Sequence, residues 1–122
     1  MAKLTLRVDF DNATRLGPGK VRLLELIGEH GSISAAGRAM GMSYRRAWLL
    51  VDSLNHAFKE PVVLTQLGGS GGGGAALSGF GQAVVDHYRA MEHEAAAAVA
   101  RRLHQLERAL AASAEIRGDL VS

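Results

Sequence analysis

The sequence contains no cysteine among its 122 residues. Disulfide bonds, thiolate zinc sites and cysteine nucleophiles are therefore excluded. No apolar run approaches the roughly 18 residues that a membrane-spanning helix needs, and the opening segment MAKLTLRVDF lacks the apolar core of a signal peptide. We therefore expect a soluble cytoplasmic protein with no membrane partner. Only two prolines are present, so few positions are forced to interrupt a helix.

The charge is small overall but unevenly distributed. The formal net charge is +2, yet residues 15–50 hold six Lys or Arg residues against Glu25 and Glu29, which leaves +4 in that segment and −2 elsewhere. A basic segment of this kind is typical of a surface that binds a polyanion such as DNA. The alternative is a solvated face without a partner.

The N-terminal part predicts a strand and a central helix. Apolar and polar residues alternate strictly over residues 3–10, which is the period of a strand with one buried face. Gly17-Pro18 then opens a helix that is apolar on more than one side. Gly31 ends that helix as a left-handed cap. A length of 122 residues with 48% hydrophobic content suits one domain with a modest core.

Two further helices are predicted around a tight turn. Ser32 caps a short helix rich in small residues that ends at Gly41, and Ser43 caps a third helix that runs to about Phe58. Helices that cross at close range need small side chains where they touch. That role is predicted for Ala35, Ala36 and Ala39.

The C-terminal half predicts a hairpin and one long helix. The segments VVLTQL and AAL are predicted strands on either side of a flexible GGSGGGG tip. Ser78 caps a helix predicted to reach about Arg117, a length of about 55 Å at 1.5 Å per residue. Its apolar stripe has nothing in the chain to cover it beyond about residue 95. This pattern favours helix pairing between subunits, the alternative being an isolated solvent-exposed helix.

The order of these elements is that of a winged helix-turn-helix. We therefore predict a mainly α fold with a small β-hairpin wing. Residues 1–77 form the winged helix-turn-helix DNA-binding domain, and residues 78–122 form a long dimerisation helix continuous with it. Pairing of two such helices places the recognition helices about 34 Å apart, one DNA turn, and requires an inverted repeat in the target.

The candidate DNA-binding residues gather at the start of the third helix. Ser43 and Tyr44 are predicted to fix its register, and Arg45 and Arg46 to contact bases or phosphates, because a guanidinium fork matches either acceptor. A helix N-terminus itself attracts phosphate. The alternative is that the arginines merely solvate an exposed turn.

Supporting roles in DNA binding are predicted for residues outside that turn. Ser34 is predicted to anchor the preceding helix to the DNA backbone, and Gln66 and Ser70 lie on or near the wing. For Trp48, the single tryptophan, core packing is favoured over a place under the wing or against DNA. Gly81 lowers helix propensity by roughly 1 kcal/mol relative to alanine, which a close approach to a neighbouring helix explains.

The segments GSISAAGRAMGMSYRRAWLLVDSLN and TQLGGSGGGGAALSGFGQ resemble the DNA-binding domain of the molybdate-responsive transcriptional regulators, the ModE family. The resemblance covers roughly residues 17–90 and includes the family's S-Y-x-x-A-W motif, its glycine-rich wing and the Leu-Ser/Thr-x-x-Gly entry to the last helix. It implies a homodimer that binds palindromic promoter DNA, with a recognition helix that starts near Ser43.

Full-length members of that family carry C-terminal β-barrel domains that bind molybdate, and no β-pattern follows the long helix here. We therefore expect that molybdate does not bind this chain. Either the chain is a DNA-binding-only member or it is a fragment of a longer protein.

Other chemistries are disfavoured. The glycine run lacks the Gly-Lys-Ser/Thr that a phosphate-binding loop needs. The histidines of the last helix, His87, His93 and His104, do not recur at the three- or four-residue spacing of a metal pair. No nucleophile with a base and no defined carboxylate pair occurs. We expect no enzyme activity, no cofactor and no metal; the alternative to a DNA-binding regulator is a winged-helix module that binds protein.

Overall fold

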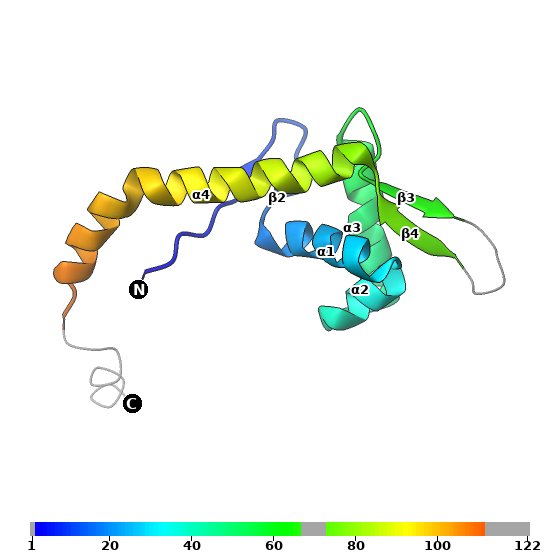
Figure 1. Cartoon of the computed structure of the whole chain (residues 1–122), viewed down its shortest axis with the longest axis horizontal. Coiled ribbons are helices and arrows are strands. Elements are labelled where there is room, and N and C mark those ends of the chain that lie inside the picture. Colours follow the sequence, from blue (N-terminus) through cyan, green and yellow to red (C-terminus); the bar gives the residue numbers. More distant parts are fainter. Residues whose placement is uncertain (1, 67–72, 112–122) are drawn as a thin grey trace.

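The computed structural model describes residues 2–66 and 73–111. In these two ranges, four helices and four short strands form a winged helix-turn-helix from which one long helix projects (Figure 1). The elements in chain order are β1 (Val8–Asp9), β2 (Arg15–Leu16), α1 (Pro18–His30), α2 (Ile33–Ala39), α3 (Tyr44–Ala57), β3 (Val63–Gln66), β4 (Gly74–Leu77) and α4 (Gly79–Arg108). The predicted fold class is confirmed. Within the described ranges, no helix has the length and apolar character to span a membrane.

Helix α1 is the centre of the domain, as predicted. Pro18 occupies its first turn, and Gly31 ends it with φ of 72°, a left-handed conformation that glycine adopts without strain. The helix buries residues on more than one side because α2, β4 and α4 all pack against it. Its buried side chains are Val21, Leu23, Leu24, Leu26 and Ile27.

The two predicted serine caps of the helix-turn-helix are confirmed. The Ser32 hydroxyl accepts a hydrogen bond from the Ala35 amide (2.9 Å), and the Ser43 hydroxyl accepts one from the Arg46 amide (3.1 Å). Gly41 has φ of 70° in the turn between α2 and α3. Each cap satisfies one amide that the helix leaves without an internal partner, so the sequence sets the start of both helices.

The packing of α2 on α3 depends on a residue other than those predicted. Ala36 is buried as expected, but Ala39 is exposed and lies outside the interface of the two helices. The close approach is at Gly37, where an added Cβ would lie 3.0 Å from the Cβ of Ala47. The prediction of Ala39 rests on its size alone, whereas the helical phase turns Gly37 toward α3.

The wing is a two-stranded antiparallel hairpin fixed to the helices at its base. Strands β3 and β4 pair with Val63 opposite Leu77 and Gln66 opposite Gly74. The Ala75 amide donates to the Gly31 carbonyl at 2.9 Å, which joins β4 to the turn between α1 and α2. The glycine-rich tip at 67–72, including Ser70, lies outside the described residues.

Helix α4 begins against the loop that connects α3 to the wing. The Ser78 hydroxyl accepts from the Gly81 amide (2.8 Å) and donates to the Pro61 carbonyl (2.6 Å). At Gly81 an added Cβ would lie 2.0 Å from the carbonyl oxygen of Val62. The predicted close approach at this glycine exists, but its neighbour is loop backbone and not another helix.

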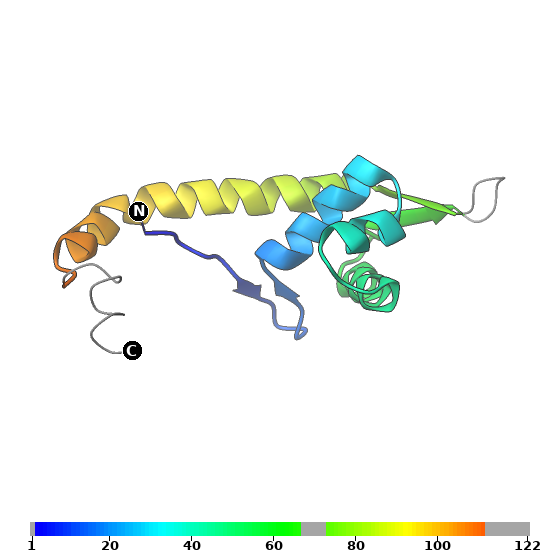
Figure 2. The ribbon, with the colours of Figure 1, turned by 90° about the horizontal axis from the view of Figure 1, so that it is seen from below.

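The described part of α4 ends at Arg108, earlier than the predicted Arg117. Its 30 residues span about 45 Å, and its distal half extends past the rest of the domain (Figures 1 and 2). Leu106 and Leu110 are 65% and 73% exposed. High helix propensity predicts continuation, but most helical stability comes from packing. Among the residues that the structure describes, these two side chains have little to pack against.

The predicted N-terminal strand is wrong in extent. Only Val8–Asp9 pairs, with β2, and Leu4 and Phe10 are each 39% exposed. The preceding residues run extended beside α4, where the Ala2 amide donates to Glu107 (2.8 Å) and the Tyr88 hydroxyl donates to the Leu6 carbonyl (Figure 2). The alternation predicts a strand with one buried face, but a strand requires a paired neighbour, which most of this segment lacks among the described residues.

The packing at Gly81 predicts opposite effects for two alanine substitutions in the same helical turn. Gly81→Ala should lower the free energy of unfolding by about 2–3 kcal/mol, because the new methyl group overlaps backbone that has no room to move. Gly79→Ala meets nothing within 4 Å and should be neutral or stabilising by up to about 1 kcal/mol. Urea denaturation measures both. Equal stability of the two variants would contradict the packing described.

Candidate nucleic-acid interface

The first turn of α3 is exposed on the surface of the domain. Ser43, Tyr44, Arg45 and Arg46 are all exposed, and Tyr44 retains 57% of its accessible surface. The turn begins at the Ser43 cap and is held from behind by Ala47, which is fully buried against α2. The structure therefore places the predicted residues together at the end of a helix whose position is fixed by packing.

Neither arginine of this turn forms an ion pair with another residue in the described part of the chain. Arg45 and Arg46 instead line a shallow depression with Ser43, Leu49 and Leu50. Because no described residue serves as their counter-ion, the two guanidinium groups direct their charge to solvent. They are also adjacent to the N-terminal amides of α3, where the helix dipole adds positive potential.

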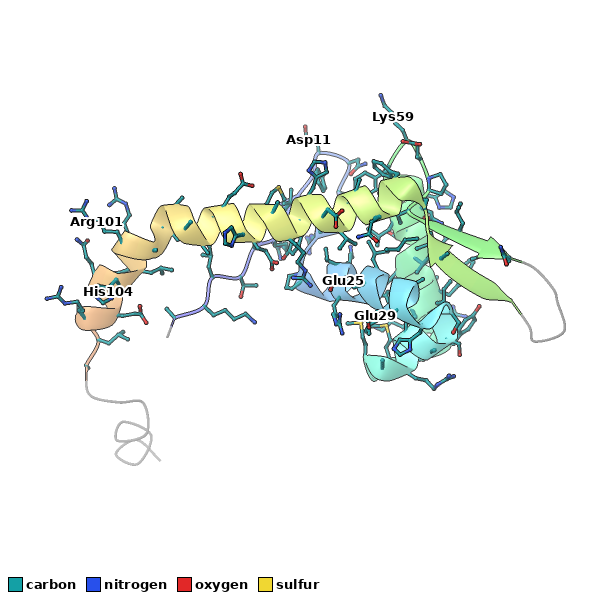
Figure 3. The ribbon with its side chains drawn as sticks, viewed as in Figure 1. Asp11, Glu25, Glu29, Lys59, Arg101 and His104 are labelled. Atoms are coloured by element: carbon teal, nitrogen blue, oxygen red, sulfur yellow. The ribbon has the colours of Figure 1, made fainter. Side chains whose placement is uncertain are left out.

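The acidic residues of the basic segment are neutralised elsewhere. Glu25 accepts from Arg89 at 2.8 Å and lies 3.4 Å from Arg22, and Arg89 also pairs with Glu92 at 2.7 Å. Figure 3 shows Glu25 and Glu29 on α1. The Arg89 hydrogen bond is the main cause that lowers the pKa of Glu25, and the same pairing raises the pKa of Arg89. These carboxylates are thus engaged by Arg22 and Arg89, which leaves the first turn of α3 with uncompensated positive charge.

Two further side chains share the outer face of α3, and sequence reasoning missed or misplaced them. Trp48 is 44% exposed, so its predicted core role is wrong, and Leu49 is 48% exposed. Trp48 lies one helical turn after Tyr44, and Leu49 lies one turn after Arg45. Each therefore lies on the same side of α3 as the earlier residue. The four-residue spacing from Tyr44 to Trp48 indicates this shared exposed side. The prediction of core packing rests instead on the large apolar surface of tryptophan.

A hollow of about 250 Å³ lies between α3 and the wing. It brings together Ser34, Tyr44 and Gln66, three of the predicted residues, with Trp48. Ser34 also accepts a hydrogen bond from Arg38 (2.9 Å). Among the described residues, the lining is Ser32, Ile33, Ser34, Tyr44, Trp48, Thr65, Gln66, Gly73, Gly74 and Ala75.

The hollow and the arginine pair are separate parts of one surface. Tyr44 lines the hollow, whereas Arg45 and Arg46 line the neighbouring depression. A helix end with free cations beside a hairpin is a surface suited to a phosphate backbone.

Among the described residues, no group of three or more potential metal ligands occurs. The expectation that the chain binds no metal or cofactor stays a prediction.

Comparison with known proteins finds relatives that match most of this chain. The chain is 38% identical over 106 residues to the molybdenum transport protein ModE of Azotobacter vinelandii, which covers 87% of the chain and 38% of that protein. It is 43% identical over 96 residues to the molybdenum-pterin-binding protein MopB of Rhodobacter capsulatus, covering 79% and 34% respectively. No family model matches the chain.

A third relative is named as a regulator. The DNA-binding transcriptional dual regulator ModE of Escherichia coli K12 is 32% identical over 87 residues, 71% of the chain and 33% of that protein. The chain thus spans about a third of the length of the curated relatives it matches. The resemblance indicated by the S-Y-x-x-A-W motif and the wing is confirmed. None of the three names describes an enzyme.

Proposed function

Because this chain is a homologue of the N-terminal region of ModE-family proteins, we propose that it is a DNA-binding transcriptional regulator of the ModE type. It binds palindromic duplex DNA in the cytoplasm as a homodimer and has no catalytic role. Molybdate has no site in this proposal, because the resemblance assigns that anion to C-terminal domains distinct from the region matched.

The observation that carries the proposal is the exposed first turn of α3. Arg45 and Arg46 extend from a helix N-terminus, and the carboxylates of α1 are paired with Arg22 and Arg89 instead. In the proposed complex this end of α3 enters the major groove and the wing contacts the adjacent backbone. Residues 1–77 act as the DNA-binding unit, in which the supporting residues are Ser34, Ser43, Tyr44, Gln66 and Ser70.

The homodimer is supported by the uncovered apolar stripe of α4. Val99, Leu103 and Leu106 recur every three or four residues along α4, and Leu106 is 65% exposed within one chain. Leu110, just past the end of the helix, is 73% exposed. A second copy of the stripe covers these side chains in the manner of a coiled coil. Residues 78–122 act as the dimerisation segment. The twofold axis that relates the two subunits then coincides with the twofold axis of the palindromic operator.

Replacement of the two arginines should weaken DNA binding and reduce its dependence on salt. We expect Arg45→Ala with Arg46→Ala to lower affinity for a duplex selected by the wild-type protein at least tenfold in 0.1 M salt. The slope of log K against log salt should fall by about 0.9 for each phosphate that the variant no longer neutralises. Fluorescence anisotropy at four salt concentrations measures both quantities.

The matched control is Arg101→Ala with Arg108→Ala, which removes the same charge from exposed positions of α4. These residues lie opposite the apolar stripe by helical phase; Figure 3 shows Arg101 on the distal part of α4. The control should keep most of the affinity and the full slope. A folded Arg45/Arg46 double variant that binds like the wild type would exclude the proposed function.

A single charge in the apolar stripe should break the dimer without unfolding the domain. Leu106→Lys is expected to weaken self-association at least tenfold, because burial of each leucine contributes about 1.5–3 kcal/mol and a lysine instead requires solvation. Gln105→Lys adds the same side chain at an exposed position off the stripe and should leave association unchanged. Sedimentation equilibrium measures both; a monomeric wild-type protein at micromolar concentration would refute the dimer.

A further inference from the structure

The hollow between α3 and the wing has walls whose positions are fixed relative to one another. Asn55 of α3 holds the start of β3 through three hydrogen bonds: its amide donates to the Val63 carbonyl (3.0 Å), and its oxygen accepts from the amides of Val62 (2.8 Å) and Val63 (3.0 Å). On the other strand, Ala75 donates to the Gly31 carbonyl (2.9 Å). The hairpin is therefore joined to both α3 and the α1–α2 turn.

The described lining of the hollow combines polar and apolar groups, and none of these residues is charged. A cation lies beside the lining, since Arg38 donates to Ser34 at 2.9 Å. Tyr44 and Trp48 supply ring faces, and Thr65 is opposite the buried Ala75 in the hairpin, which places it on the side that faces the helices. The side chains of Tyr44, Trp48, Thr65 and Gln66 make no hydrogen bond to other residues that the structure describes. Each of them has at least one N–H or O–H donor to offer.

We infer, on the premise of the proposed function, that this hollow is the subsite for one sugar–phosphate segment of the DNA strand. The segment passes from the major groove at α3 toward the wing. The uncharged donors of Tyr44, Trp48 and Thr65 hydrogen-bond its phosphate oxygens, and the aromatic rings pack on the deoxyribose. Interactions of this class position a protein on the duplex without reading its sequence.

The chemistry of the hollow favours a diester segment over a free ligand. Its volume of about 250 Å³ falls below the range of roughly 300–1,000 Å³ typical of small-molecule pockets. A free phosphate monoester carries close to two charges and is normally met by Arg or Lys. Neither occurs among the lining residues that the structure describes, and the guanidinium of Arg38 is already hydrogen-bonded to Ser34. A phosphodiester carries one charge, and neutral donors are among its usual partners.

The surface therefore has two parts with different electrostatic roles. Arg45 and Arg46 supply cations, whose binding to phosphates releases counterions and sets the salt dependence of the complex. The hollow supplies affinity through neutral groups, so its contribution is independent of salt. This difference makes the two parts separable by experiment.

The test combines Tyr44→Phe with Thr65→Val, which removes two hydroxyl groups and keeps the shape of the hollow. We expect affinity for the selected duplex to fall about tenfold, since each neutral hydrogen bond changes an equilibrium constant severalfold. The slope of log K against log salt should stay at the wild-type value. Thr5→Val, at an exposed position outside the hollow, is the matched control and should bind like the wild type.

The single tryptophan provides a second readout on the unmodified protein. Trp48 is 44% exposed in the free chain, so acrylamide should quench its fluorescence readily. Quenching should fall at least twofold when saturating duplex is bound.

The inference is overturned if the wild type binds duplex and the Arg45/Arg46 variant is weakened, yet the Tyr44/Thr65 variant binds normally. Unchanged Trp48 quenching in the complex also overturns it, as does a lower salt slope in the Tyr44/Thr65 variant. Failure of the wild type to bind duplex with any salt dependence is a different result, because it removes the proposed function itself.

Discussion

The close packing of α2 on α3 is the constraint on which the surface of this protein depends. At Gly37 there is room for a hydrogen atom and little more, since an added Cβ would lie 3.0 Å from that of Ala47. Ala47 is fully buried at this point, while the residues just before it, Arg45 and Arg46, stay outside. A larger side chain at either position would separate the helices and change the angle at which the first turn of α3 is presented. The backbone approach of two helices thus determines where the positive charge lies.

A second group of interactions joins the wing and the long helix to the same framework. Asn55 hydrogen-bonds to the backbone of Val62 and Val63, Ser78 donates to the carbonyl of Pro61, and Gly81 packs on the carbonyl of Val62. Helix α3, the wing and helix α4 therefore meet at the short loop between α3 and β3. Because α4 starts against this loop, these contacts fix its position relative to α3. In the proposed dimer, a partner that covers the distal stripe of α4 would therefore set a fixed distance between the two α3 helices.

Local signals in the sequence were sufficient for most of the fold, since proline, glycine and serine act on their immediate neighbours. Ser32, Ser43 and Ser78 each cap the helix predicted for them. Predictions failed where the outcome depended on parts of the chain distant in sequence. The alternation at residues 3–10 found no pairing strand beyond Val8–Asp9. The hollow has residues from four segments of the chain, so no single motif could indicate it.

The central claim is that the N-terminal half of α3 and the wing form one DNA-binding face. The most direct test is a two-dimensional amide NMR titration of the full chain with a duplex that it selects from a random pool. The account predicts that the largest shifts fall on residues 43–49 and on strands β3 and β4, with distal α4 little changed. Shifts concentrated on α1 and α4 around Glu25 and Arg89, or no shifts at all, would contradict it.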